Sequence, residues 1–498
     1  LAASYRGDLY NRVLVRPASI SLGALASRAV QTVEVWNAWL VANTLSSIVA
    51  SGGEGLTFAG PAPAPTTFGP LESRNYTLTA DVNGPPTIAA SYALAFTTET
   101  RQLTVTGLRV IGWPDGPNWA QPVLERLQWQ TSVLRARSGA EQRVRLRAAP
   151  RRSWQYTGLR PNDAQRVQQE NMLRAWQARV YAMPVWTDGQ YLTAPVAAGA
   201  TGVSLDTTLR DYTVGGLLAL RDAQGMFIGR VASVSAGSLT LSSPVDRAYA
   251  APVLAAPARP ARLQNPATLQ YVTDAVLQFA PQWQQLDAWA ELTPTTETAD
   301  YRGLPVLATR TDWAPSPTLP VDVARDLAVF DPGTGTWGVD DLSGVSTAVR
   351  THHWLLNGRQ AIADFRAWLA ARAGRLNPFW LPSGQSDAQP LAVSGAALTV
   401  AGQSYATLLS GASGRRDLMI VLTDGTRQYR RIASAVDNGD GTETWTLDAV
   451  PSPVYVLAQI ASLQFMMPVR LDADQVEIAY ETDSIARATL RLRTVAGL

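Results

Sequence analysis

The feature that most constrains this chain is an internal repeat, because short blocks of its first half recur in the same order in its second half. The matched pairs are VLERLQW (123–129) with VLATRTDW (306–313), LRAWQARVYAMPVW (173–186) with FRAWLAARAGRLNPFW (365–380), GRVASV (229–234) with RRIASA (430–435), SSPV (242–245) with PSPV (451–454), and YVTD (271–274) with YETD (480–483). Matches that keep one order indicate a duplicated structural unit. We therefore predict two tandem copies, at 123–283 and 306–497, joined by a connector at 284–305.

Each copy is expected to begin with strands and to continue with one helix. Gln142–Arg147 shows the period-2 alternation of a strand. Pro161-Asn162-Asp163 supplies a turn and an N-cap for the helix of the first copy. Apolar stripes at helical spacing predict the core-facing side of each helix: Val167, Leu173, Trp176 and Val180 in the first copy, and Ile362, Phe365, Trp368 and Leu369 in the second.

A run of short strands and hairpins follows each helix, at about 190–256 and 385–456. We predict a small β-subdomain inserted in each copy, which then closes with an alternating strand. DNGDGTE (437–443) looks like a calcium loop, but it lacks the later glutamate ligand and the flanking helices of an EF-hand. Its Asn-Gly and Asp-Gly pairs predict a hairpin turn instead.

The segment before the repeat has a different pattern. Residues 12–112 contain about six or seven short strand-like runs, separated by turn signals such as Asn83-Gly84-Pro85-Pro86. That spacing favours a β-sandwich. Ser51–Pro70 is rich in Gly, Pro and Ala and predicts a long loop.

Composition excludes several classes of protein. The chain is 46% hydrophobic and 16% charged, which is enough apolar material for folded cores. Its net charge of +2 gives no support for a nucleic-acid or polybasic membrane partner. It contains no cysteine, which excludes disulfides and thiolate metal sites. The sequence contains no run of 18 apolar residues, so no transmembrane helix is predicted.

Catalytic patterns are weak. His352 and His353 are the two histidines, and adjacent residues of an extended segment point to opposite faces. Gly333-x-Gly335-x-x-Gly338 is followed by Val-Asp-Asp rather than by a helix, so it does not predict a dinucleotide site. Asp340-Asp341 has no partner acid at a recognisable spacing. We expect a protein that is not an enzyme and that needs no cofactor or metal.

The helix pattern apolar-Arg-Ala-Trp, the exit Pro378-Phe-Trp-Leu-Pro382 and the closing alternating strands resemble tail-tip proteins of long-tailed bacteriophages. The nearest kinds are distal tail proteins and baseplate hub proteins. The VEVWNA strand that begins at Val33 is similar to strands of immunoglobulin-like sandwiches, which often decorate phage tails.

The resemblance implies a mainly β protein with a few helices. Its parts would be an immunoglobulin-like sandwich at 1–115, a tube-like split β-barrel unit at 116–283, the connector at 284–305, and a second tube-like unit at 306–498. Each unit would carry one flanking helix and the inserted β-subdomain.

The resemblance also implies a ring that joins the tail tube to the tip and surrounds the DNA channel. Its partners would be further copies of itself, the tail tube protein, other baseplate and tail-tip proteins and the tape-measure protein, with DNA only in transit. Three chains with two units each would give a pseudo-sixfold ring, and six chains are the alternative. The protein would be made in the host bacterial cytoplasm and would reside at the tail tip of the virion. Two units in one chain favour a hub over a distal tail protein.

Two sets of residues are candidates for structural roles. Aromatic packing predicts a structural core formed by Trp129, Trp176, Trp186, Trp313, Trp368 and Trp380. The second copy is longer than the first near 331–346, which predicts a subunit contact loop containing Asp331, Trp337, Asp340 and Asp341.

A different class of function stays open at this point. A carbohydrate-binding adhesin of the virion surface would recognise the host envelope by stacking sugars on exposed tryptophans, with Trp36, Trp39, Trp113 and Trp119 as candidates. A glycosidase or peptidase is a third class, which no specific pattern supports.

Overall fold

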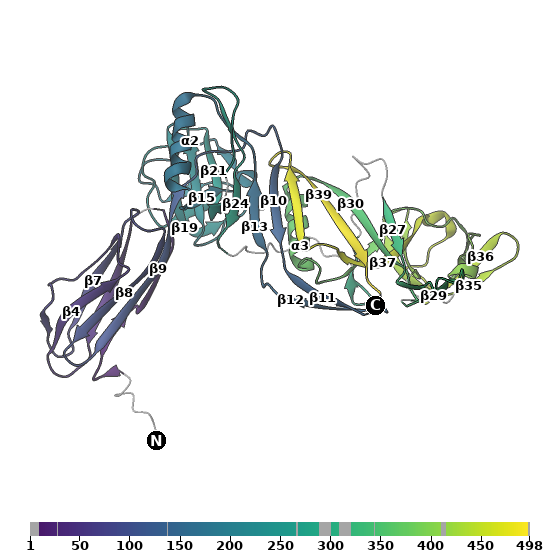
Figure 1. Cartoon of the computed structure of the whole chain (residues 1–498), viewed down its shortest axis with the longest axis horizontal. Helices are drawn as coiled ribbons and strands as arrows, with labels where there is room; N and C mark the ends of the chain where they lie inside the picture. Colours follow the sequence, from purple (N-terminus) through teal and green to yellow (C-terminus); the bar gives the residue numbers. More distant parts are fainter. Residues whose placement is uncertain are drawn as a thin grey trace, which may run out of the picture. The chain divides into compact units, whose positions relative to one another are not determined.

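A computed structural model shows a chain that is mainly β, with 53% strand and 9% helix, which confirms the predicted fold class. It describes residues 9–26, 28–136, 138–264, 267–287, 300–307, 320–342, 344–409 and 415–496. The chain forms two compact units: the first contains residues 1–123 and 153–288, and the second contains 124–152 and 289–498. Figure 1 labels their elements along the chain.

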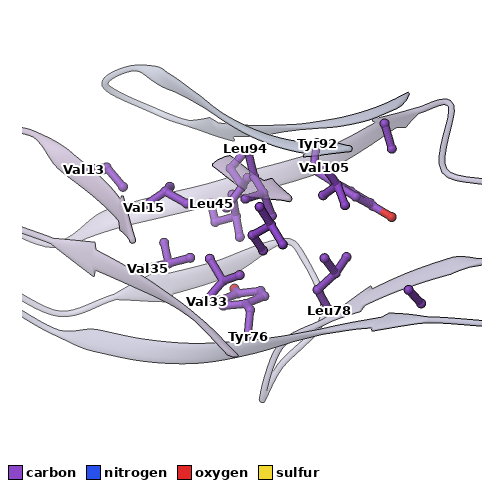
Figure 2. Packing of buried hydrophobic residues seen from close by; sticks show 14 of the residues in the cluster. Val13, Val15, Val33, Val35, Leu45, Tyr76, Leu78, Tyr92, Leu94 and Val105 are labelled. Carbon is purple, nitrogen blue, oxygen red and sulfur yellow. The ribbon is translucent and has the colours of Figure 1, made fainter. Parts of the chain in front are cut away.

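The N-terminal part of the first unit is a two-sheet sandwich. One sheet contains, in order, β1 (Val13–Arg16), β3 (Ala29–Asn37), β7 (Ser73–Ala80) and β5 (Leu56–Ala59). The other contains, in order, β6 (Thr66–Phe68), β4 (Asn43–Ser51), β8 (Thr87–Phe96), β9 (Thr100–Gly112) and β2 (Ser19–Leu25). Alternate residues of both sheets point inward and form one apolar core, to which Val33, Leu94 and Val105 belong (Figure 2).

The rest of the first unit is built around the long strand β21. Its elements are β13 (Arg151–Gln155, from Ser153 on), β14 (Gly158–Arg160), α2 (Asp163–Trp176), β15 (Val180–Pro184), η1 (Trp186–Asp188), β16 (Gln190–Leu192), β17 (Gly202–Ser204), β18 (Leu217–Asp222), β19 (Gly225–Ser235), β20 (Ser238–Leu241), β21 (Val253–Leu263), β22 (Leu269–Tyr271), β23 (Leu277–Phe279) and β24 (Gln282–Gln285). The side chain of Asn162 accepts a hydrogen bond from Gln165 N at 3.0 Å, which confirms the predicted N-cap of α2.

The second unit is built around β37 in the same manner. Its elements are β10 (Val123–Gln128, from Leu124 on), β11 (Thr131–Arg135), β12 (Glu141–Arg145), β25 (Asp300–Tyr301), β26 (Leu304–Pro305), β27 (Val321–Ala324), β28 (Leu327–Phe330), β29 (Gly338–Asp341), β30 (Thr347–Asn357), α3 (Arg359–Arg372), β31 (Phe379–Pro382), β32 (Pro390–Ser394), β33 (Ala397–Ala401), α4 (Tyr405–Leu408), β34 (Asp417–Leu422), β35 (Arg427–Asp437), β36 (Thr442–Leu447), η2 (Leu457–Gln459), β37 (Ile460–Leu471), β38 (Gln475–Tyr480) and β39 (Ile485–Thr494).

Strand registers show that the two units repeat one topology. Pro184 and Leu217 both pair with Ala258, whereas Pro382 and Asp417 both pair with Met466. The β19–β20 ladder shifts register after Val231, and the β35–β36 ladder shifts after Ile432. The GRVASV and RRIASA blocks therefore occupy equivalent positions and carry the same β-bulge.

The closing hairpins are equivalent too. Tyr271 pairs with Leu277 in β22–β23, and Tyr480 pairs with Ala486 in β38–β39. A threonine hydroxyl accepts a backbone hydrogen bond in each turn, from Val276 N in the first unit and from Ile485 N in the second, both at 3.0 Å. The YVTD and YETD blocks are thus the same turn in two copies.

Other blocks match in sequence but not in structural position. Ser242 N donates to Arg230 O and Asp448 N donates to Arg431 O, so SSPV corresponds to the segment from Asp448 and not to PSPV. The helix blocks are displaced by about one turn, because the N-caps Asn162 and Gly358 are equivalent whereas the Arg-Ala-Trp triplets lie at different distances from them.

The first block is displaced as well. Trp113 N donates to Ala182 O and Leu307 N donates to Trp380 O. Because Ala182 and Trp380 are equivalent, the repeat begins near residue 112 in the first unit and near 306 in the second. Residues 124–152, which we expected in the first copy, belong to the second compact unit.

The resemblance implies tube-like split β-barrel units, and the described sheets do not form closed barrels. In the first unit β9, β15, β21, β24 and β13 pair in that order, and no described pairing joins β9 to β13. A barrel requires both edge strands to pair with each other. Strand β9 instead continues from the sandwich sheet, where it already pairs with β8 and β2.

Candidate assembly surfaces

Most of the predicted core tryptophans are buried. Trp129, Trp186, Trp368 and Trp380 are all nearly inaccessible to solvent. In α3 the whole predicted stripe of Ile362, Phe365, Trp368 and Leu369 is buried. Trp313 lies outside the described residues.

Trp176 is a correction to the predicted core, because 43% of its surface is exposed. Val167, from the same predicted stripe, is exposed as well. Leu173 and Val180 are buried as predicted, but α2 ends at Trp176 and Val180 belongs to β15. Within α2 the buried residues are Gln169 and Leu173, so the side of the helix that packs is narrower than the predicted stripe.

The predicted contact loop is the end of a projecting arm, which we call arm 2 and define as residues 321–342. Strands β28 and β29 form its hairpin, and every residue of β27, β28 and β29 is exposed. Phe330 is 70% exposed and Trp337 is 68% exposed, close to the turn of the hairpin. Large apolar side chains gathered on an exposed hairpin are typical of an interaction site.

The acidic residues of arm 2 lie in different local settings. Asp341 forms an ion pair with Arg325. Asp331 accepts a hydrogen bond from Gly333 N at 2.8 Å, which shapes the turn. Asp340 lies on β29 and is exposed. Gly333 and Gly335 of the GxGxxG pattern lie in this turn, and Gly338 begins strand β29 rather than a helix.

Residues 124–152, which we call arm 1, are seated in the second unit through a buried carboxylate. Glu125 is completely buried, and its carboxylate accepts hydrogen bonds from Arg152 Nε at 2.5 Å and Tyr480 Oη at 2.6 Å. It also forms an ion pair with Arg366 Nη2 at 3.6 Å. Burial alone would raise the pKa of Glu125, but the charges of Arg152 and Arg366 outweigh it and keep the pKa lowered. The carboxylate is therefore charged and links arm 1 to α3 and β38.

Further polar contacts fix arm 1. Arg470 binds both carboxylate oxygens of Glu141, at 2.7 and 2.8 Å. Asp474 accepts hydrogen bonds from Thr131 N at 2.9 Å and Arg375 N at 3.0 Å. Bidentate pairs between arginine and carboxylate are geometrically specific. Arm 1 is thus held in one defined position.

A polar pocket of about 300 Å³ lies in the first unit. Its lining is Asp115, Gly116, Pro117, Asn118, Leu159, Arg160, Pro161, Gln165 and Arg221. Burial raises the pKa of Asp115, and the paired Arg160 partly opposes this rise. One carboxylate paired with arginine can hold a polar group, but this lining supplies no nucleophile with an adjacent base.

The remaining candidates are dispersed. His352 is buried, whereas His353 Nδ1 lies 2.9 Å from Thr489 Oγ1, so the two rings face opposite sides of β30 as predicted. Trp113, one of the tryptophans that could stack on a sugar, is completely buried against Trp283 and cannot contact a glycan. No cluster of three or more His, Cys, Asp or Glu ligands occurs in the described ranges. No described helix is both long and apolar enough to cross a membrane.

Comparison with known proteins gives no family for the chain. No protein-family model matches it. No curated protein matches it either.

The signal for these surfaces was partly present in the sequence. The greater length of the second copy near 331–346 predicted a contact loop, and residues 331–342 of it form the end of arm 2. The seat of arm 1 was missed, although Pro260-Ala-Arg-Leu263 and Pro468-Val-Arg-Leu471 are a further matched block that contains the Glu141 partner Arg470. This block aligns Arg262 of the first copy with Arg470 of the second copy.

Proposed function

We propose that this protein is a structural component of a bacteriophage tail tip or baseplate, and that it associates with copies of itself into a ring between the tail tube and the tip. The observation that carries the proposal is arm 2, an exposed apolar hairpin on a chain built from two repeated β units. Apolar hairpins of this kind are an aggregation hazard unless a partner covers them.

The repeat supports a particular stoichiometry. Two units of the same topology in one chain allow three chains to present six equivalent units. A ring of three chains can then meet a sixfold tube on one side and a threefold tip on the other. Six chains, with one unit of each facing the lumen, are the alternative arrangement, and the tube protein, tape-measure protein and other tip proteins would be the neighbours.

Negative-stain electron microscopy of the purified full-length chain tests this proposal. We expect ring-shaped particles with a central channel, and end-on binding of these particles to isolated tail tubes. Compact monomers at all concentrations would contradict the ring. Rings that bind glycans and ignore tubes would contradict the tail-tip assignment and favour a virion-surface adhesin.

A further inference from the structure

Arm 1 and arm 2 occupy equivalent places in the repeat. Arm 1 lies between Trp113 and Trp154, and arm 2 lies between Leu307 and Arg350. Trp113 and Leu307 are equivalent by their hydrogen bonds to Ala182 O and Trp380 O. Trp154 pairs with Trp283, and Arg350 pairs with Leu492. Trp283 and Leu492 are equivalent because they pair with the equivalent leucines at the ends of β21 and β37. Each arm carries a two-stranded hairpin at its end, β11–β12 or β28–β29.

Only one of the two arms is seated. Arm 1 rests on the face of the second unit formed by α3, β38 and the end of β37, through Glu125, Glu141 and the partners described above. Every strand residue of arm 2 is exposed. Equivalent segments with different burial indicate that the seat of arm 2 is provided by another molecule.

The face of the first unit that corresponds to the seat of arm 1 is bare. Tyr480, which binds Glu125 in that seat, is 1% exposed, whereas its equivalent Tyr271 is 57% exposed. Arg470 is buried against Glu141, whereas its equivalent Arg262 is exposed. Arg262 forms no ion pair or side-chain hydrogen bond within the part of the chain that the structure describes. We call this face, formed by α2, the β22–β23 hairpin and Arg262, the open seat.

The charges of the arms match different seats. Arm 1 contains eight arginines and two glutamates, and the segment between Leu471 and Tyr480 that receives it contains three acids. Arm 2 contains five aspartates and one arginine. In the sequence, residues 264–270 contain no acid and follow Arg262, whereas the acids of the open seat lie on α2 (Asp163 and Glu170) and between β22 and β23 (Asp274). The stretch beside Arg262 therefore lacks the acids of its equivalent in the second unit, and it suits the acidic arm 2 better than the arginine-rich arm 1.

We propose that arm 2 of one chain docks on the open seat of a second copy, as arm 1 docks on the second unit within one chain. The proposal rests on the self-association in the proposed function and names the surfaces that perform it. The association is head-to-tail, because arm and seat are different surfaces, and head-to-tail contacts that close generate rings. In a ring of three chains every unit then holds one arm, three arms from within the chain and three from a neighbour.

Cross-linking between two single-cysteine variants tests the docking, since the natural chain contains no cysteine. Trp337→Cys places a thiol at the end of arm 2, and Gln264→Cys places one beside Arg262 in the open seat. After the two variants are mixed and treated with a short bismaleimide, we expect a covalent dimer that contains one chain of each. The matched control is Val49→Cys, on an exposed position of the N-terminal sandwich, which should give no covalent dimer with Trp337→Cys.

Charge reversal gives an independent readout. Arg262→Glu should weaken self-association by about tenfold or more, because it opposes the acidic arm 2. The control Arg28→Glu changes an exposed arginine of the sandwich and should leave association unchanged. An oligomer that survives Arg262→Glu and yields no Trp337–Gln264 cross-link would overturn the docking but leave the proposed self-association intact. A chain that stays monomeric at all concentrations would overturn both.

Discussion

The buried hydroxyl of Tyr480 allows a quantitative test of how arm 1 is held. In Tyr480→Phe the ring stays and the hydrogen bond to Glu125 Oε2, 2.6 Å long, is lost. A hydrogen bond to a charged group contributes about 1.5–3 kcal/mol, and the carboxylate keeps its arginine partners. We therefore expect the free energy of unfolding of the second unit to fall by about 2 kcal/mol, which corresponds to a decrease of about 4–8 °C in its Tm.

Differential scanning calorimetry is the suitable assay, because a chain with two compact units does not unfold as one two-state system. Tyr271→Phe is the matched control, since it removes the same hydroxyl from the equivalent but exposed position of the first unit, where the hydroxyl donates to Glu170 at 3.1 Å in contact with solvent. It should change either transition by less than about 0.5 kcal/mol. Equal effects of the two substitutions would refute the buried role of Glu125 and with it the seating of arm 1.

Three further predictions concern the tryptophans of the helices, the equivalent arginines of the two units and a buried histidine. Trp368→Ala should lower the free energy of unfolding by about 3–5 kcal/mol because the ring is buried, and Trp176→Ala should lower it by less than about 1 kcal/mol. Urea unfolding measures both values, and equal decreases would contradict the core described above. Arg470→Ala should lower the free energy of unfolding by about 3 kcal/mol, because it leaves the buried carboxylate of Glu141 unpaired. Arg262→Ala should leave the free energy of unfolding almost unchanged in dilute protein. An Arg470→Ala chain of unchanged stability would contradict a role for the ion pair. Burial, then the charge of Arg350, lowers the pKa of His352 from 6.5 to about 4, so its folded form resists protonation. Stability should fall between pH 6.5 and 4 by up to about 3 kcal/mol, and His352→Phe should remove that part of the pH dependence, with an unchanged pH profile as the contradicting result.

The sequence predicted local and periodic features well. Alternation and turn chemistry predict a mainly β chain, and Pro161-Asn162-Asp163 predicts the N-cap whose hydrogen bond the structure shows. The repeat was found from blocks such as GRVASV and RRIASA, which occupy the same β-bulge in both units. These features depend on neighbouring residues in the sequence, so a local pattern is enough to reveal them.

The features that depend on long-range packing were not predicted. A helical stripe shows that a helix is amphipathic, but the burial of Trp368 and the exposure of Trp176 depend on which surfaces cover each helix. No local sequence pattern indicates that the Glu125 carboxylate forms an ion pair with Arg366 and accepts a hydrogen bond from Tyr480, because both residues are distant in the sequence. The same limit explains why residues 124–152 were assigned to the first copy, whereas they fold with the second unit.

The mass of the purified particle tests the central claim most directly. One chain has a mass of 53.5 kDa, so three chains amount to about 160 kDa. Native mass spectrometry or light scattering should show this trimer for the natural chain and a shift toward single chains for Arg262→Glu. A natural chain that remains at 53.5 kDa across the accessible concentration range would contradict the account.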